Sequence, residues 1–361
     1  MKVESVDAYP ITLKIGETLQ GGTFAYTHYM TVLVRAVVDG VEGWGEAMTR
    51  FDPAATALMV RFLSKSIVGL EFVAVGDPWA KVWHELRARG HTRGTDVEAL
   101  SGLEMALYDC HGRLTKKPLG ALFSSAPLQS VPAFAGSLFA SRGPLDGQVE
   151  MAKSSGLMGA KVKAGFGVEE DRQLLARVRK AWPDGMLVAD ANGAYDASGA
   201  AKACEAFADL DLAWFEEPVL SDDFGGYSAL KNSKVKIGAG ESWFVTDFDW
   251  TIDGGLVGVV EPSVSRCGGV GVEMDVAKRA AARGIGFSPM TGMNSAVSLA
   301  ASLHAASVRP SLGVEYNPFA NPLQTELASG IGSPRGGMLP VPSGYGLGVE
   351  VDMRFVKAHV L

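Results

Sequence analysis

From about Val131 onward, short apolar segments alternate with amphipathic helical segments at intervals of about 25 residues. Eight of the apolar segments read as strands: VPAFAG, GAKVKAG, MLVADAN, LAWFEEP, VKIGAGES, LVGVVEPS, IGFSPM and LGVEY. Segments such as EEDRQLLARVRKAW and VGVEMDVAKRAAARG lie between them and have helical spacing. Eight strands that alternate with helices predict a (β/α)₈ barrel. The alternative is an open doubly wound sheet, which more usually carries a glycine-rich dinucleotide loop after its first strand; none is present here.

The first third of the chain orders its elements differently. Two β-rich stretches, KVESVDAYPITLKI and YMTVLVRAVVDGVEGWGEA, flank the predicted loop GETLQGGTFAYTH, and helical spacing follows from Asp52 to about Ala121. Strands followed by helices indicate an α+β unit, and we expect the Gly- and Pro-rich tail to return to it. We therefore predict an α+β domain over 1–128, a barrel over 129–319 and a returning C-terminal segment over 320–361.

Composition limits the partners that such a chain can have. The net charge of −7 and a pI near 5.5 argue against a nucleic-acid partner or an anionic membrane surface, but not against a small anionic substrate. No apolar stretch approaches the roughly 20 residues that span a bilayer, and the N-terminus resembles a first strand more than a signal peptide. The three cysteines, Cys110, Cys204 and Cys267, are far apart and odd in number. We therefore expect a cytoplasmic protein with no disulfide framework.

Carboxylates follow three consecutive barrel strands at the ends where such barrels place their catalytic residues. Asp190 ends the third predicted strand, Glu216 and Glu217 end the fourth, and Glu241 ends the fifth. Side chains at neighbouring strand ends converge, and three carboxylates would repel one another unless a cation held them together. Hard oxygen ligands on a rigid frame suit Mg²⁺. A single acid at a strand end is usually a cap or a surface charge, but the set favours a metal site.

Two lysines lie on the strand next to these carboxylates. Lys161 and Lys163 are two residues apart in GAKVKAG, so in a strand their side chains point to the same side. Burying one ammonium group costs several kcal/mol unless a partner relieves it, so burying two requires negative charge nearby. We expect both lysines to face the carboxylates and an anionic ligand held there.

The motifs KVK, DAN, EEP and GES occur in this order, one per predicted strand, and they resemble the enolase superfamily. The run EPSVSRCGG and the tail segment SGYGLGVEVD are similar to the mandelate racemase branch in particular. The resemblance covers essentially the whole chain. It implies an α/β fold, namely a modified (β/α)₈ TIM barrel over which an N-terminal α+β capping domain closes, and a homo-oligomer.

The resemblance also implies a chemistry. Mg²⁺ would be bound by Asp190, Glu216 and Glu241, and the reaction would be abstraction of the proton α to a carboxylate, with the metal stabilising the enediolate. By the same resemblance Lys163 would be the base. Lys161 would bind the carboxylate of the small-molecule substrate, and its charge would lower the pKa of Lys163.

The chain departs from this branch at the second base. Mandelate racemase relatives carry a His at the end of the seventh strand and an Asp after the sixth, where this chain has Met290 and Ser263. No residue from 131 to 300 is a histidine, and the second lysine of the muconate lactonizing branch is also missing. Arg266 can bind an anion, but it stays protonated and cannot act as a base. A racemase or epimerase, which needs bases on both faces, is therefore disfavoured.

Further candidates for substrate contact are Asn192 in DAN, Ser263 and Met290 as parts of the pocket wall, Arg266, Glu315, Tyr26 and His28. Glu315, at the end of the eighth strand, can hydrogen-bond a substrate carboxylate if it is protonated, or it is a solvated acid. Tyr26 and His28 belong to the predicted loop of the capping domain, where one of them can supply an acid, although His28 alone also fits a surface histidine.

A single lysine base favours a Mg²⁺-dependent lyase that dehydrates a hydroxy acid or acid sugar to a 2-keto product. Lysine can remove the α-proton and return it to a departing β-hydroxyl on the same face. The first alternative is a cycloisomerase or other isomerase of a sugar-acid lactone or related carboxylate. The second, from a different class, is a non-catalytic metal-dependent carboxylate-binding homologue.

Overall fold

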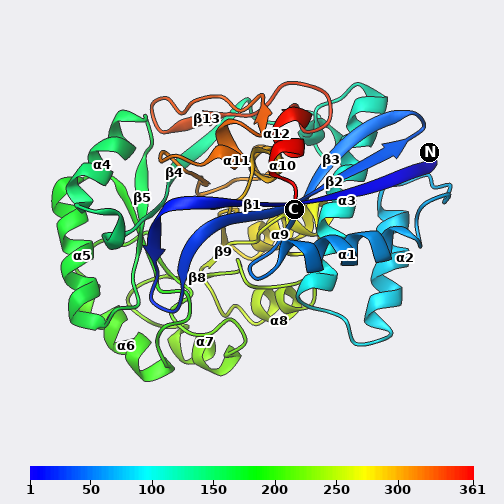
Figure 1. Ribbon diagram of the computed structural model, residues 1–361. Helices are drawn as coiled ribbons and strands as arrows, with labels where there is room; N and C mark the ends of the chain where they lie inside the picture. The colour runs from blue at the N-terminus through cyan, green and yellow to red at the C-terminus, as the bar shows by residue number, and fades with distance from the viewer.

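The computed structural model describes all residues from 1 to 361, and its centre is a barrel of eight parallel strands (Figure 1). The strands are β4 (Ser130–Leu138), β5 (Gly159–Lys163), β6 (Met186–Asp190), β7 (Trp214–Glu216), β8 (Ile237–Ala239), β9 (Val259–Val260), β10 (Gly286–Phe287) and β11 (Val314–Tyr316). They pair in the order β10-β9-β8-β7-β6-β5-β4-β11, and the Leu312 N–H donates to the Phe287 carbonyl at 2.8 Å where the ring closes. Seven of them fall within one predicted segment each, and β4 extends beyond the segment VPAFAG at both ends, so the predicted barrel is confirmed.

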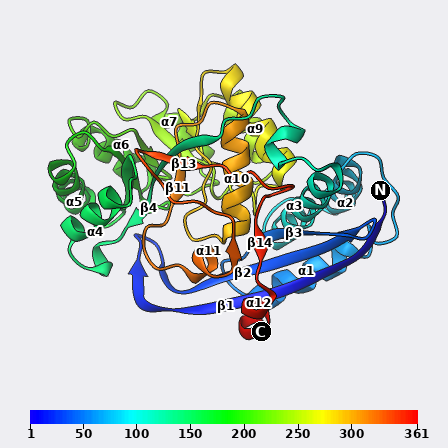
Figure 2. The same cartoon turned by 90° about the horizontal axis from the view of Figure 1, so that it is seen from above.

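Seven helices connect consecutive barrel strands and surround them (Figure 2). They are α4 (Leu145–Ser154), α5 (Val168–Ala181), α6 (Ala197–Ala206), α7 (Phe224–Leu230), α8 (Asp247–Asp253), α9 (Val270–Ala282) and α10 (Ala296–Val308). Side chains of Asp196, Asp223 and Ser295 cap the first backbone N–H groups of α6, α7 and α10. After β11 the short helix α11 (Pro322–Thr325) stands where a regular barrel would have its eighth helix.

The N-terminal domain packs three helices on one face of an antiparallel sheet. Strands β1 (Val3–Gln20), β2 (Ala25–Val38) and β3 (Val41–Met48) form the sheet, and α1 (Pro53–Ser64), α2 (Gly76–Arg87) and α3 (Thr95–Thr115) follow. Helix α3 packs so close to β3 that a Cβ atom added to Gly45 would lie only 2.1 Å from the Gly102 carbonyl oxygen. The order of strands then helices is the predicted α+β arrangement.

The prediction of a loop over residues 16–28 is wrong, because most of these residues belong to two paired strands. Strand β1 continues to Gln20 and β2 begins at Ala25, with Leu19 opposite Tyr26 and only a short tip between them. The pairing is irregular between Lys14 and Leu19, as at a β-bulge, and the ladder resumes beyond it. The glycine pair therefore marks a hairpin turn, not the start of a long loop.

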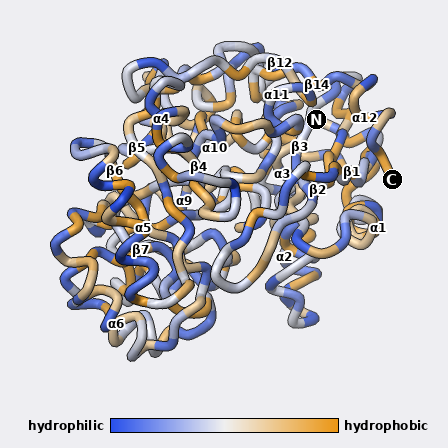
Figure 3. The backbone as a smooth tube through the Cα atoms, turned by 60° about the vertical axis from the view of Figure 1, so that its left-hand side comes forward, coloured by the Kyte–Doolittle hydropathy of each residue, from blue (hydrophilic) through white to orange (hydrophobic).

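The C-terminal segment contacts both domains. Strand β13 (Met338–Pro340) pairs antiparallel with β4 of the barrel, and β12 (Ala328–Ser329) pairs with β14 (Glu350–Val351). Its last helix, α12 (Met353–His359), was not predicted; the chain then forms a bridge with β1 through Val360 and Ile11. The domain limits at 128/129 and 319/320 stay a prediction. Hydrophobic and hydrophilic residues are interspersed along the chain (Figure 3), and none of its helices has the length and apolarity to cross a membrane.

Two buried carboxylates of the capping domain hold it on the barrel. Glu46 of β3 accepts hydrogen bonds from the Ser295 and Ser298 N–H groups at the N-terminus of α10, at 3.1–3.2 Å. Glu104 of α3 accepts from the Gly271 N–H in the first turn of α9, at 3.2 Å. The oxygens of both acids accept from N–H groups that have no partner within their own helices, which stabilises the helix N-termini. The end of β3 is thereby fixed over the barrel.

Candidate active site

Strand register brings the predicted lysines and carboxylates together. Lys163 lies opposite Asp190 in the β5–β6 pair, and Asp190 lies opposite Glu216 in the β6–β7 pair. Glu241 follows two residues after the end of β8. The lysine side chains are 1% and 5% exposed, and Asp190 and Glu216 are fully buried. The expectation that both lysines face the carboxylates is met in the structure.

Lys161 lies at the centre of the acidic cluster. Its Nζ is 3.0 Å from Glu216 Oε1, 2.9 Å from Glu216 Oε2 and 3.5 Å from Asp190 Oδ2, and it also forms an ion pair with Glu315. Glu315 accepts a further hydrogen bond from the Gly292 N–H at 2.8 Å. Glu315 is therefore a buried partner of Lys161 and not a solvated acid.

Lys163 is held by an acid and an amide. It forms an ion pair with Asp190 and donates to Asn192 Oδ1 at 2.8 Å. Asn192 Nδ2 in turn donates to Glu241 Oε1 at 3.0 Å, so Asn192 links Lys163 to Glu241. The Asn192 backbone has φ 46°, and its carbonyl accepts a hydrogen bond from the Thr23 hydroxyl at 3.0 Å. The β1–β2 hairpin tip is thus closed on the strand ends that carry the predicted base.

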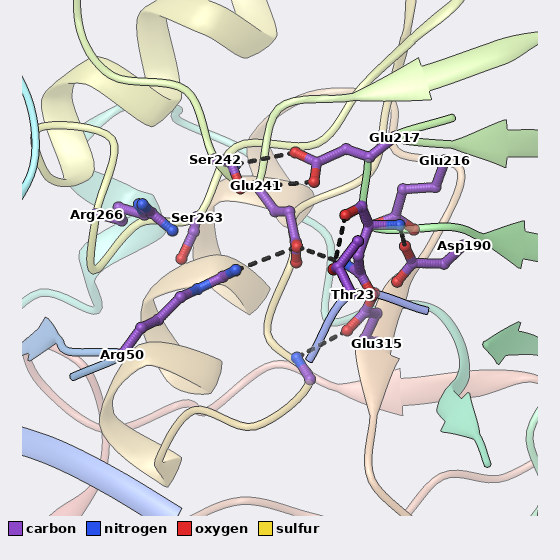
Figure 4. A network of polar contacts seen from close by, with 12 residues as sticks. Thr23, Arg50, Asp190, Glu216, Glu217, Glu241, Ser242, Ser263, Arg266 and Glu315 are labelled. Atoms are coloured by element: carbon purple, nitrogen blue, oxygen red, sulfur yellow. Dashed lines mark hydrogen bonds and ion pairs between the residues drawn. The ribbon is translucent and has the colours of Figure 1, made fainter. Parts of the chain in front are cut away.

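Arg50 is a site residue that the sequence reasoning missed. It follows β3 in the capping domain, and its guanidinium reaches across to Glu241 Oε1 at 3.1 Å (Figure 4). In the same view Glu217 points away from Glu241 toward Ser242, whose N–H lies 3.3 Å from Glu217 Oε1. The sequence signal for Arg50 is an arginine shortly after a strand of the capping domain, in EAMTR, whereas the site was predicted from the strand ends of the barrel.

The electrostatics of the cluster differ from one expectation. Burial and, after it, the charge of Lys161 act to lower the pKa of Lys163, but Asp190, Tyr26 and Glu241 together outweigh them and the pKa is raised. For Glu241, burial acts to raise the pKa, while Arg50 and the two lysines lower it to about 2. The pKa of Glu217 is raised to about 8, mainly by burial and then by the charge of Glu241. Lys161 therefore acts on the pKa of Lys163 in the predicted direction, but the net pKa is raised in this arrangement, chiefly because Asp190 lies in direct contact with Lys163.

The donor set suits Mg²⁺ in chemistry. Hard carboxylate oxygens on a rigid frame are the ligands that this ion prefers, and Asp190, Glu216 and Glu241 offer them. Buried Glu216 Oε2 accepts no hydrogen bond in good geometry despite its contact with Lys161. In the structure no three acidic, His or Cys side chains are grouped to hold a metal, because Lys161, Lys163 and Arg50 lie on the carboxylates. The three predicted metal ligands therefore stay a prediction.

A cavity of about 70 Å³ lies between the strand ends and the capping domain. Of the predicted substrate contacts, Tyr26, His28, Met290 and Glu315 line it together with Lys161, Lys163 and Glu241. Among the lining residues not predicted are Met30, Met48, Thr49, Arg50, Ser137, Phe139, Met293 and Asn294. His28 is the only histidine in the wall, and none of the barrel strands carries one.

Three of the predicted contacts lie outside the cavity wall, namely Asn192, which bonds Lys163, and Ser263 and Arg266. Ser263 is fully buried, with its hydroxyl 3.3 Å from that of Ser265. Arg266 faces Glu98 of α3 at 3.4 Å and lies over the Phe244 ring, 4.9 Å from its centroid. A buried guanidinium needs an acidic or aromatic partner, and the capping domain supplies one. Arg266 therefore contacts the capping domain instead of the cavity.

Two known domain families match the chain, one over most of the barrel and the other over most of the capping domain. Residues 146–355 match the family described as enolase C-terminal domain-like, and residues 12–123 match the mandelate racemase / muconate lactonizing enzyme N-terminal domain. The chain belongs to the mandelate racemase/muconate lactonizing enzyme-like group of the enolase superfamily. The resemblance read from KVK, DAN, EEP and GES is thereby confirmed.

Individual members of this superfamily resemble the chain over most of its length. The D-galactarolactone cycloisomerase of Agrobacterium fabrum is 28% identical over 98% of this chain and 97% of that protein. The L-rhamnonate dehydratase of Saccharopolyspora erythraea is 26% identical over 89% of this chain and 84% of that protein. The crystal structure of a racemase from Streptomyces coelicolor A3(2) with bound magnesium is 25% identical, covers 99% of this chain and 100% of that one, and has a TM-score of 0.90.

Proposed function

We propose that this protein is a Mg²⁺-dependent enzyme that removes the proton α to the carboxylate of an acid-sugar-like substrate, with Lys163 as the base. The observation that carries the proposal is the placement of Lys161 and Lys163 side by side, in the cavity wall and in contact with the strand-end carboxylates. A protein that only bound a carboxylate would need one cation there and no second buried lysine. The superfamily relatives named above, a dehydratase and a cycloisomerase, support the same chemistry.

Each residue has a distinct part in this reaction. Lys161 binds and neutralises the substrate carboxylate, and Lys163 takes the α-proton onto Nζ. Asn192 orients Lys163 through its 2.8 Å hydrogen bond, and the closed hairpin tip excludes water from the reacting carbon. When bound by Asp190, Glu216 and Glu241, magnesium supplies the positive charge that stabilises an enediolate. Lys163 would act as the base when its contact with Asp190 is released, because that carboxylate raises the lysine pKa.

The reaction that one base supports best is a β-elimination on one face of the substrate. After it takes the α-proton, Lys163 is an ammonium group that can donate the same proton to a departing β-oxygen. Loss of a hydroxyl in this way gives an enol that becomes a 2-keto acid, which is dehydration. We retain this as the first candidate because the cavity wall has neither a second lysine opposite Lys163 nor a histidine on a barrel strand.

Cycloisomerisation is the second candidate, and one observation favours it. The D-galactarolactone cycloisomerase matches nearly the full length of both chains at 28% identity, slightly above the dehydratase. In a lactone or cyclic ether the leaving oxygen stays attached to the substrate, so the same one-face elimination opens the ring without loss of water. The same lysine pair serves either outcome.

We also propose that the protein is cytoplasmic and forms a homo-oligomer. Its three free, buried cysteines are in keeping with the cytoplasm.

A panel of aldonic and aldaric acids with their lactones, incubated with Mg²⁺ in D₂O, tests these proposals. Mass spectrometry separates a product that has lost water from an isomer of unchanged composition, and NMR detects deuterium at the α-carbon. We expect one class to react and Lys163→Ala to remove both turnover and exchange. Tight Mg²⁺-dependent binding without turnover or exchange would favour the non-catalytic alternative. Equal exchange in wild type and Lys163→Ala would refute the assignment of the base.

A further inference from the structure

One buried carboxylate joins two loops of the barrel. Asp171 of α5 is fully buried, and it accepts hydrogen bonds from the Gly165 N–H at 2.7 Å and the Phe166 N–H at 3.1 Å. It also accepts a hydrogen bond from the Tyr195 hydroxyl. Gly165 and Phe166 lie between β5 and α5, whereas Tyr195 lies between β6 and α6. The Asp171 carboxylate therefore ties the β5–α5 loop to the β6–α6 loop.

The tip of the β1–β2 hairpin contacts the same two loops. Gly22 lies so close to the β5–α5 loop that a Cβ atom added to it would be 2.8 Å from the Gly165 Cα. The Thr23 hydroxyl donates to the Asn192 carbonyl in the β6–α6 loop at 3.0 Å. Gly165 itself has φ 95°, and a Cβ atom there would lie 2.7 Å from the Ala194 Cβ. The hairpin tip can make both contacts at once only while the two loops keep this close spacing.

The two loops also adjoin the proposed base. Lys163 is the residue before the β5–α5 loop, and it donates to Asn192 of the β6–α6 loop at 2.8 Å. Neither Asp171 nor Tyr195 lines the cavity. A hydroxyl that donates to a carboxylate forms a stronger hydrogen bond than one between neutral groups. Asp171 and Tyr195 can therefore act on the site only through the loops that they join.

We propose that Asp171 and Tyr195 are positioning residues, and that their hydrogen bond holds the two loops at the spacing that the closed hairpin tip requires. With the bond in place, the tip contacts both loops and covers the strand ends that carry Lys163 and Asn192. Without it the loops can separate, and the tip loses one of its two contacts. The bond thereby controls whether the proton on Lys163 is shielded from solvent. This last step rests on the proposed function, since it takes Lys163 as the base.

Proteolysis of the native protein tests the proposal without a substrate. Chymotrypsin cleaves after aromatic residues, and Phe24 and Tyr26 lie at the hairpin tip. Tyr195→Phe deletes only the hydroxyl, and we expect it to speed cleavage at these two sites about tenfold or more, the lower end for loss of a hydrogen bond to a charged group. Tyr227→Phe is the matched control, because Tyr227 is fully buried and its hydroxyl donates to the Val219 carbonyl at 3.2 Å. The control should leave cleavage at the tip unchanged.

A second substitution at the tip shows whether the effect passes through the contact with Gly165. Gly22→Ala adds a Cβ atom that meets Gly165, so it should open the tip by itself. Tyr195→Phe should then speed cleavage little further in the Gly22→Ala background, because the contact that it weakens is already lost. Multiplied effects in the double variant would overturn the proposal. Equal tip cleavage in wild type and Tyr195→Phe would also overturn it, and so would a uniform rise at every cleavage site.

Proton retention tests the link to the base. In D₂O with Mg²⁺ and an acid that the enzyme converts, deuterium at the α-carbon of the recovered substrate is compared with the amount of product. We expect Tyr195→Phe to raise this ratio about threefold or more, because an open tip lets solvent exchange the proton on Lys163 before it is returned. An unchanged ratio together with faster tip cleavage would overturn the link to Lys163. Failure of the proposed function would appear separately, as the absence of turnover in the wild type, and the cleavage rates would still decide whether the pair positions the tip.

Discussion

Replacing Glu46 by Gln should loosen the capping domain from the barrel. Glu46 is 1% exposed and accepts hydrogen bonds from the Thr31 hydroxyl at 2.7 Å, the Ser295 hydroxyl at 2.6 Å and the Ser295 and Ser298 N–H groups. All of these groups donate to Glu46, and the two N–H groups can only donate, so the NH₂ group of a glutamine must displace at least one of the present hydrogen bonds. A buried donor without an acceptor costs about 1–3 kcal/mol, and loss of the charge at the α10 N-terminus costs about 0.3–1 kcal/mol more.

These terms predict a loss of about 1–4 kcal/mol in the free energy of unfolding, a large part of the 5–15 kcal/mol typical of a folded protein. Urea unfolding followed by circular dichroism measures the loss. Glu42→Gln is the matched control on the same strand, because Glu42 is 41% exposed and pairs with Arg35, and exposed pairs are worth about 0–1 kcal/mol. Equal effects of the two substitutions would refute the reasoning. The cavity-lining residues Met48, Thr49 and Arg50 lie two to four positions after Glu46, so Glu46→Gln should also weaken substrate binding.

Three further predictions concern charge. Glu216→Gln should abolish turnover and remove the stabilisation by Mg²⁺ that thermal unfolding detects in the wild type, about 2.7 kcal/mol at 100 times the Kd; a retained Mg²⁺ shift would show that Glu216 is no ligand. In D₂O, Lys163 should exchange the α-proton of only one epimer of an inert substrate analogue, and exchange in both epimers would reveal a second base. Lys163→Ala should lower the rate about 10²-fold or more, whereas Lys161→Ala should chiefly weaken binding. Burial raises the pKa of Glu104 from 4.5 to about 8, so the folded state binds more protons than the unfolded state in this window and stability should fall as pH rises through it. Glu104→Gln should flatten that part of the urea-midpoint profile against pH, and an unchanged slope would assign it to other groups.

The barrel half of the site could be predicted from the sequence because two periodic rules act together. Alternating strands and helices place the carboxyl ends of parallel strands on one side, and alternation within GAKVK places both lysines together. Asp190, Glu216 and Lys163 consequently occupy matching register positions, which is a local consequence of strand pairing.

The capping half could not be predicted in the same way. Arg50 and Met48 reach the cavity only because Glu46 and Glu104 dock their domain on α10 and α9, and this docking joins residues more than 160 positions apart. Arg266 shows the reverse case. It lies after a barrel strand as expected, but its charge is directed to Glu98 of α3, a partner that no local pattern announces. The β1–β2 hairpin likewise continues past an irregular pairing between Lys14 and Leu19, through the segment that was predicted to be a loop.

The position of Met290 also limits the chemistry that the family fold can carry out here. Lys163 lies on the β5 side of the cavity and Met290 lies after β10, where related racemases place a histidine base. A thioether cannot accept a proton at any relevant pH, so Met290 supplies neither a proton acceptor nor a donor at this position. The hairpin tip covers the β5–β6 side, with Thr23 bonded to Asn192 and Gly22 packed against Gly165 so closely that a Cβ would lie 2.8 Å from its Cα. The proton on Lys163 is thereby shielded from solvent while the tip is closed. It must return to the same face of the substrate, and this favours its delivery to a leaving oxygen over inversion of the α-carbon.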